Sequence, residues 1–264
     1  MGDLQWIGGS LRFTGFFQQA PSLLSLQLWK QLCGEEPLIR NETPRMGAVH
    51  EEGPLGPMNL SIDLVSFRVD LVLGPLNAAP TNTPTVDNCS VPNIGIIESA
   101  YPLYFSLVGR LLKLPQMPIL SRIALGAVYL YPVGTRSEGY KRIGDLLPFK
   151  PDPENSSELF YQINRPKKLL FNNKEIVINR LTKWSVAMYQ FQQFPVPLDL
   201  MNNILPPGFS PGNILAPPPS FAVMIDQDIN TAPEMNLNFD ASASLSLLPQ
   251  LKEYADEIAQ KGDI

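Results

Sequence analysis

The amino-acid sequence predicts an α+β fold, in which a largely antiparallel sheet carries about four helices packed on it. Two observations support this prediction. Segments with strand-like alternation mostly follow one another without a regular strand-helix-strand rhythm, and amphipathic helical segments interrupt them. A hydrophobic fraction of 44% in 264 residues supplies enough apolar surface for a substantial core.

The N-terminal part contains strands and one helix. Ser10–Phe17 is rich in strand-forming residues, and a helix is expected between Pro21, suited to a first turn, and Gly34, suited to the position after the last turn. The run Asn59–Leu73 alternates apolar and polar residues, but its phase changes by one residue near Leu64. Such a change moves later side chains to the other face of a sheet, so we expect a β-bulge or a strand crossing between environments there.

The C-terminal part alternates helices with strands. The predicted elements are a helix at Glu98–Pro115, a strand at Ile119–Pro132, a short helix at Glu138–Pro148, strands at Ser157–Pro166, Glu175–Phe194 and Phe221–Asn230, and a closing helix that starts at Pro249 and ends at Gly262. Asn172 and Asn173 suit a turn, so a long antiparallel hairpin is expected around them.

Residues 1–264 are interpreted as a single α+β domain. The segment Gly74–Asn93 is rich in Pro, Asn and Thr and has no periodicity, so the alternative is two closely packed halves, 1–74 and 94–264, joined by this loop. Phe194–Phe221 holds eight prolines and is predicted to be a stiff surface loop.

The residues available for chemistry are few. The single histidine, His50, lies in a segment bounded by Gly and Pro that predicts a surface loop, with Glu51 and Glu52 beside it to keep it exposed. We interpret it as a solvated loop residue, which leaves no imidazole for a hydrolase triad or a zinc site. Cys33 and Cys89 lack metal or redox spacing and are expected to be free thiols.

The sequence also predicts the cellular location of the protein and the overall charge of its surface. The first residues lack a basic segment followed by an apolar stretch, and no run approaches eighteen apolar residues, so we expect a soluble cytoplasmic protein without membrane contact. The net charge of −5 argues against a surface that is basic all round.

The stretch FAVMIDQDIN is the first candidate site. Asp226, Asp228 and Asn230 are spaced by two, so in a strand they share one face. Their oxygens could hold Mg²⁺ or Ca²⁺, or they could be the solvated face of an exposed edge strand, and we favour the edge strand without a cofactor.

The hairpin between Leu159 and Phe194 is the second candidate. It carries basic side chains opposed only by Glu175, with aromatic residues nearby. This composition suits a nucleic acid or another anionic partner, whereas the plain alternative is a solvated turn over core aromatics. The candidate binding residues are Arg165, Lys167, Lys168, Arg180, Lys183 and Trp184.

The order of several motifs resembles a known family. RIALGAVYLYPV, EGYKRIGDLLP, LFYQINRP, INRLTKWSV, a D-x-D-x-N strand and a closing amphipathic helix follow one another in the second half. This order resembles an uncharacterised, sporadically distributed bacterial protein family with a mid-chain R-x-x-L-R-Y-x-N strand and a D-x-D strand before its last helix. Here Arg122 is followed by IALGAVYLY, which lacks that family's second Arg and its Asn. The resemblance implies no activity.

Three functional hypotheses follow. The leading one is a non-enzymatic bacterial interaction or accessory protein that binds a macromolecular partner, with a protein favoured over nucleic acid. The first alternative is a metal-dependent enzyme acting on a phosphorylated or nucleotide substrate, with Asp226 and Asp228 as ligands. The second alternative is nucleic-acid binding through the basic hairpin.

Overall fold

The computed structural model describes residues 5–18, 27–76, 91–190, 218–233 and 237–263. The predictions for Cys89, for most of the segment at 74–93 and for most of the proline-rich segment at 194–221 fall outside the described residues. The elements are β1 (Ile7–Phe17), α1 (Leu28–Cys33), β2 (Ile39–Thr43), the 3₁₀ turn η1 (Pro44–Met46), β3 (Ala48–Leu55), β4 (Met58–Val65), β5 (Arg68–Pro75), α2 (Ile97–Leu112), β6 (Leu120–Val133), α3 (Arg136–Gly144), β7 (Phe160–Asn164), β8 (Lys167–Phe171), β9 (Lys174–Tyr189), β10 (Ser220–Thr231) and α5 (Ala241–Lys261).

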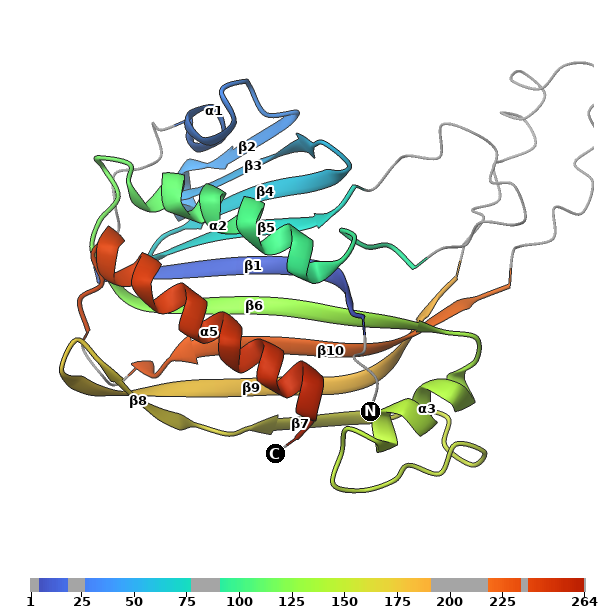
Figure 1. Cartoon of the computed structure of the whole chain (residues 1–264). Helices are drawn as coiled ribbons and strands as arrows, with labels where there is room; N and C mark the ends of the chain where they lie inside the picture. Colours follow the sequence, from blue (N-terminus) through green and yellow to red (C-terminus); the bar gives the residue numbers. More distant parts are fainter. Residues whose placement is uncertain (1–4, 19–26, 77–90, 191–217, 234–236, 264) are drawn as a thin grey trace, which may run out of the picture.

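The strands form one ten-stranded antiparallel sheet (Figure 1). Its order is β2-β3-β4-β5-β1-β6-β10-β9-β7, and β8 also pairs with β9. The predicted α+β class with a largely antiparallel sheet is confirmed. Strand β1 pairs with β5 on one side and β6 on the other, so strands from before residue 77 and after residue 90 belong to the same sheet.

Helices α2 and α5 lie over the same face of this sheet (Figure 1). Buried side chains such as Leu11 and Phe13 of β1 belong to the same core cluster as buried residues of both helices. Tyr104 of α2 donates a 2.7 Å hydrogen bond to the Leu71 carbonyl. Gln227 of β10 donates a 3.1 Å hydrogen bond to the Ala255 carbonyl of α5. These two hydrogen bonds limit the cost of burying the Tyr104 hydroxyl and the Gln227 amide nitrogen.

Side-chain caps determine where two helices begin. Thr135 accepts from the Glu138 amide at the start of α3, and the Glu138 side chain accepts from the amide of Gly134, the residue before the cap. Asp240 accepts from the Ala243 amide at the start of α5. The predicted start of the closing helix at Pro249 is therefore wrong: α5 begins at Ala241, because Asp240 supplies the cap, and Pro249 lies inside the helix.

The phase change after Leu64 has a different cause from the one predicted. No single strand runs through it: β4 ends at Val65, β5 begins at Arg68, and the two strands pair as a hairpin. Ser66 in the connecting turn has a φ of 45°, in the left-handed region. The predicted bulge or crossing strand is thus wrong, because a two-residue turn with strand residues on both sides also shifts the alternation.

His50 lies in strand β3, and the predicted surface loop is wrong. The segment forms a hairpin with β4 whose turn follows Leu55. Successive side chains of a strand point to opposite faces, so Glu51 points away from His50. Glu51 is fully buried on the helix side, where it accepts a 2.7 Å hydrogen bond from the Trp29 amide of α1 and pairs with Arg40.

The predicted turn at Asn172 and Asn173 is confirmed. Their φ angles are 49° and 61°, and they join β8 to β9 in a two-residue hairpin. Asparagine tolerates this left-handed conformation better than most residues. Strand β9 is long enough to pair with β7 as well, beyond the end of β8.

Trp184 of β9 is expected to act through packing. Its side chain is 1% exposed and its ring centre lies 5.5 Å from that of Tyr161. Replacing it by alanine should lower the free energy of unfolding by about 3–5 kcal/mol, because a large buried ring leaves a cavity. Urea denaturation of Trp184→Ala measures this loss. The control is Phe160→Ala on neighbouring β7, where the ring is 66% exposed and little change is expected. Equal effects of the two substitutions would contradict the assignment.

Candidate functional site

The candidate site is the open face of the sheet, defined as the face opposite α2 and α5. Side chains that alternate with the core residues of each strand point to it. One row of directly paired positions runs across seven strands from β3 to β9 and is polar at every strand except β6. We call it the polar row; its residues, in sheet order, are His50, Asp63, Asp70, Thr14, Ala124, Asn230 and Asn179.

Two carboxylates stand directly opposite each other in this row. Asp63 of β4 and Asp70 of β5 are register partners, an arrangement that repels unless it is compensated. His50 contacts Asp63 at 2.7 Å, while Arg68 contacts Asp70 at 2.6 Å and Thr14 donates to it at 2.5 Å. Each carboxylate therefore has its own basic partner.

An arginine spans a neighbouring strand to reach the next carboxylate. Arg12 of β1 stands opposite Gly126 of β6, and Gly126 stands opposite Asp228 of β10. The Arg12 guanidinium donates to Asp228 at 3.0 Å. A Cβ atom at Gly126 would lie 3.1 Å from Arg12 Nε. The absence of a side chain on β6 thus leaves the space through which the two residues meet.

The side chains of the D-x-D-x-N stretch have the predicted orientation, but their strand, β10, lies inside the sheet and not at its edge. Asp226, Asp228 and Asn230 share the open face, and β10 pairs with β6 and β9 on its two sides, so the predicted edge strand is wrong. Asp226 pairs with Lys183 at 3.2 Å, and Asp228 also accepts a 2.8 Å hydrogen bond from Asn230. Among the described residues, no three His, Cys, Asp or Glu side chains cluster closely enough to hold a metal ion.

Arg122 of β6 differs from the other arginines of the open face. Its guanidinium donates to the Thr231 carbonyl at 2.9 Å and to Asn230 Oδ1 at 2.8 Å, and it lies 4.8 Å from the centre of the Phe16 ring. Within the described ranges no carboxylate lies within ion-pair distance of it. It lines a hollow of about 260 Å³, whose other residues are Arg12, Thr14, Phe16, Asp63, Arg68, Asp70, Val72, Ala124 and Asp228.

The predicted basic hairpin residues divide between the two faces. Lys183 lies on the open face, where it pairs with Asp226. Lys168 pairs with Glu175 at 2.7 Å within its own hairpin. Trp184, predicted as a stacking residue, is buried in the core and has no surface to offer a base.

The remaining hairpin cations face the end of α5. Arg165 donates to Asp263, which holds the pKa of that carboxyl below its ordinary value. Lys167 and Arg180 lie 3.5 Å and 3.8 Å from Glu257. These three cations fasten the hairpin to the helix, so the predicted basic residues do not form one common surface.

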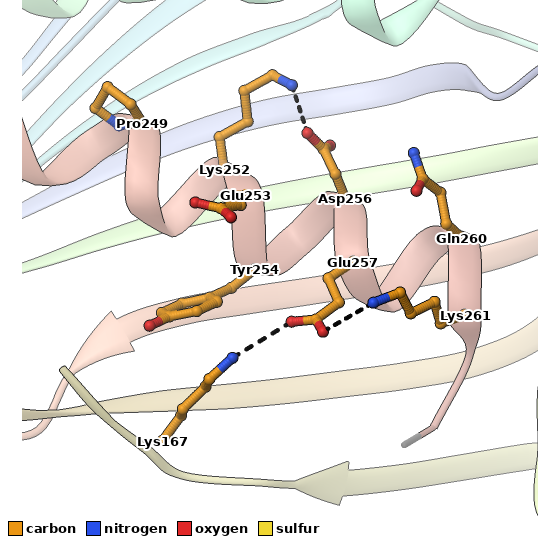
Figure 2. A pocket seen from close by; sticks show the side chains of 9 residues that line it. All are labelled: Lys167, Pro249, Lys252, Glu253, Tyr254, Asp256, Glu257, Gln260 and Lys261. Atoms are coloured by element: carbon orange, nitrogen blue, oxygen red, sulfur yellow. Dashed lines mark hydrogen bonds and ion pairs between the residues drawn. The ribbon is translucent and has the colours of Figure 1, made fainter.

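A second hollow of about 420 Å³ follows the outer side of α5 (Figure 2). Figure 2 shows Lys167 reaching from β8 to Glu257, which also pairs with Lys261. The Lys167 ammonium lies 4.6 Å from the centre of the Tyr254 ring. On the same helix Lys252 pairs with Asp256. Charges of both signs alternate along this groove and neutralise one another.

Two comparisons with known protein sequences were negative. No protein-family model matches the chain, and no curated protein sequence matches it. The resemblance to the bacterial family with the D-x-D strand stays a prediction. Within the described ranges, no helix combines the length and apolar content needed to cross a bilayer.

Sequence reasoning did not identify most residues of the open face. The residues missed are Arg12, Thr14, Asp63, Asp70 and Arg122. Each is next to at least one buried apolar residue of its strand, a signal that assigns it to the polar side of the strand. That signal does not say which strands are adjacent, so it could not bring these residues together.

The His50 contacts predict a pH dependence of stability. Burial alone would lower the pKa of His50, but hydrogen bonds to Asp63 and Glu52 outweigh it and raise the pKa above 6.5. A raised folded pKa gives stability that is fully present below the unfolded value of about 6.5 and is lost as pH rises through the folded value. Urea unfolding from about pH 5 to about pH 9 should show this loss in the wild type and a flatter profile in His50→Gln. Identical profiles would contradict the assignment.

Proposed function

We propose that this protein is a non-enzymatic bacterial interaction protein that binds a protein partner through the open face of its sheet. The observation that carries the proposal is that charged and amide side chains on the face opposite α2 and α5 are already held in position by one another, as in the Arg12–Asp228 and Lys183–Asp226 pairs. Side chains that are ordered before binding lose little conformational entropy when a partner arrives.

The dimensions of the open face suit a protein interface. Nine strands follow one another in the sheet, and a spacing of about 4.8 Å gives a width of roughly 40 Å. A stable protein interface buries about 800 Å² on each partner, so the face is wide enough to supply one.

The charge pattern favours a protein over nucleic acid. A nucleic-acid surface needs basic side chains free to neutralise phosphates. Here Arg12, Arg68 and Lys183 of the open face are paired with carboxylates. Among the hairpin cations, Arg165 and Lys167 pair with acidic residues at the end of α5. The hypothesis of a nucleic-acid-binding hairpin therefore has less support.

The same pairs reduce the support for a metal-dependent enzyme. Mg²⁺ or Ca²⁺ bound to Asp226 and Asp228 would have to compete with the Lys183 ammonium and the Arg12 guanidinium. Both carboxylates have a structural use in the sheet, so a catalytic role is not required to explain them.

Site-specific photo-crosslinking tests the proposal. A benzophenone amino acid is introduced at Ser61 or at Gln162, both on the open face, and at Glu253 on the exposed side of α5 as the control. Irradiation in the producing cells should give discrete products from the first two positions that protease removes and nuclease leaves intact. Products from Glu253 alone, or products sensitive to nuclease, would contradict the proposal.

A further inference from the structure

The hollow around Arg122 is lined by three arginines and three aspartates, and among the described residues Arg122 is the arginine of this hollow that has no carboxylate within ion-pair distance. Arg12 pairs with Asp228, Arg68 pairs with Asp70, and the third carboxylate, Asp63, pairs with His50 from the adjacent strand. These contacts use every carboxylate that lines the hollow. Arg122 is bound only by neutral acceptors among the described residues.

The Arg122 guanidinium is held in a fixed orientation. Its Nε and Nη2 donate to Thr231 and Asn230, and its Cζ atom lies over the Phe16 ring. Its Nη1 group has no acceptor in the part of the chain that the structure describes. A planar donor group already fixed in place suits the two oxygens of a carboxylate better than a flexible ammonium does.

Apolar side chains border the same corner of the open face. Phe16 stands between Arg68 and Arg122 as the register partner of both. Val65 stands directly opposite Arg68 and is 36% exposed. Arginine and aromatic side chains together are the composition that protein interfaces concentrate at their centre.

We propose that this hollow binds a protein segment that presents one aspartate or glutamate carboxylate to Arg122 with an apolar side chain next to it. A single carboxylate matches the one guanidinium of the hollow that has no ion-pair partner among the described residues. A phosphate of higher charge would meet repulsion from Asp70 and Asp228, which line the same hollow. The inference rests on the proposed function, because it names the kind of partner that the open face would take.

Selection from a phage-displayed library of random peptides tests this chemistry. The wild type should enrich peptides with an acidic residue beside an apolar one. For the best synthetic peptide, replacing its acid by the amide should weaken binding to the wild type about tenfold or more, since a charge-assisted hydrogen bond is lost. Arg122→Gln should bind the two peptides equally. Arg122→Lys keeps the positive charge but lacks the paired planar N–H donors of the guanidinium, so it should retain part of the discrimination between the acid and the amide.

Arg142→Gln is the matched control. Arg142 also lies over an aromatic ring, 5.5 Å from the centre of Tyr131, but it belongs to helix α3 and does not line the hollow. The Arg142→Gln variant should discriminate between the peptides as the wild type does. Thermal melting establishes that every variant used is folded.

Three outcomes would overturn the inference: no enrichment, enriched peptides without acidic preference that bind Arg122→Gln unchanged, or displacement by inorganic phosphate more effective than by glutamate at equal concentration. In the second case, loss of binding in Ser61→Arg would leave the proposed function of the open face standing. Crosslinking confined to α5 would instead remove the proposed function itself.

Discussion

Compensation of charge across strands is the constraint on which this structure depends. Helices cover one face of the ten-stranded sheet, so the other face must keep its charged side chains in water and still avoid repulsion between close carboxylates. The contact of Arg12 with Asp228 shows how this is achieved: the side chain extends over Gly126 and joins two strands that are not neighbours. A residue with a side chain at Gly126 would occupy that path.

Charged side chains on the helix-covered face of the sheet are also compensated, but by residues of helices and of neighbouring strands. Glu51 enters the helix side fully buried, and the Trp29 amide and Arg40 satisfy it. The cations of the β7–β9 region engage Glu257 and Asp263 at the end of α5, so they attach the sheet to its last helix. These paired charges thus serve the fold, and the ordered open face that results is suited to contact with a protein.

Local patterns in the sequence predicted much of the fold and part of the site. Alternation along β10 gave the shared face of Asp226, Asp228 and Asn230, and the two asparagines at 172 and 173 gave the hairpin turn. Alternation could not reveal that β10 has neighbours on both sides, because strand order depends on contacts between distant segments. Likewise Arg12 and Asp228 are 216 residues apart, and no local signal connects them.

A double-mutant cycle between Arg12 and Asp228 tests the central claim most directly. Free energies of unfolding are measured for the wild type, Arg12→Gln, Asp228→Asn and the double variant at low salt. Because the two side chains are 43% and 33% exposed, the account predicts a favourable coupling of about 0.5–1 kcal/mol that shrinks as salt is added. Additive single effects at low salt would contradict charge compensation across Gly126.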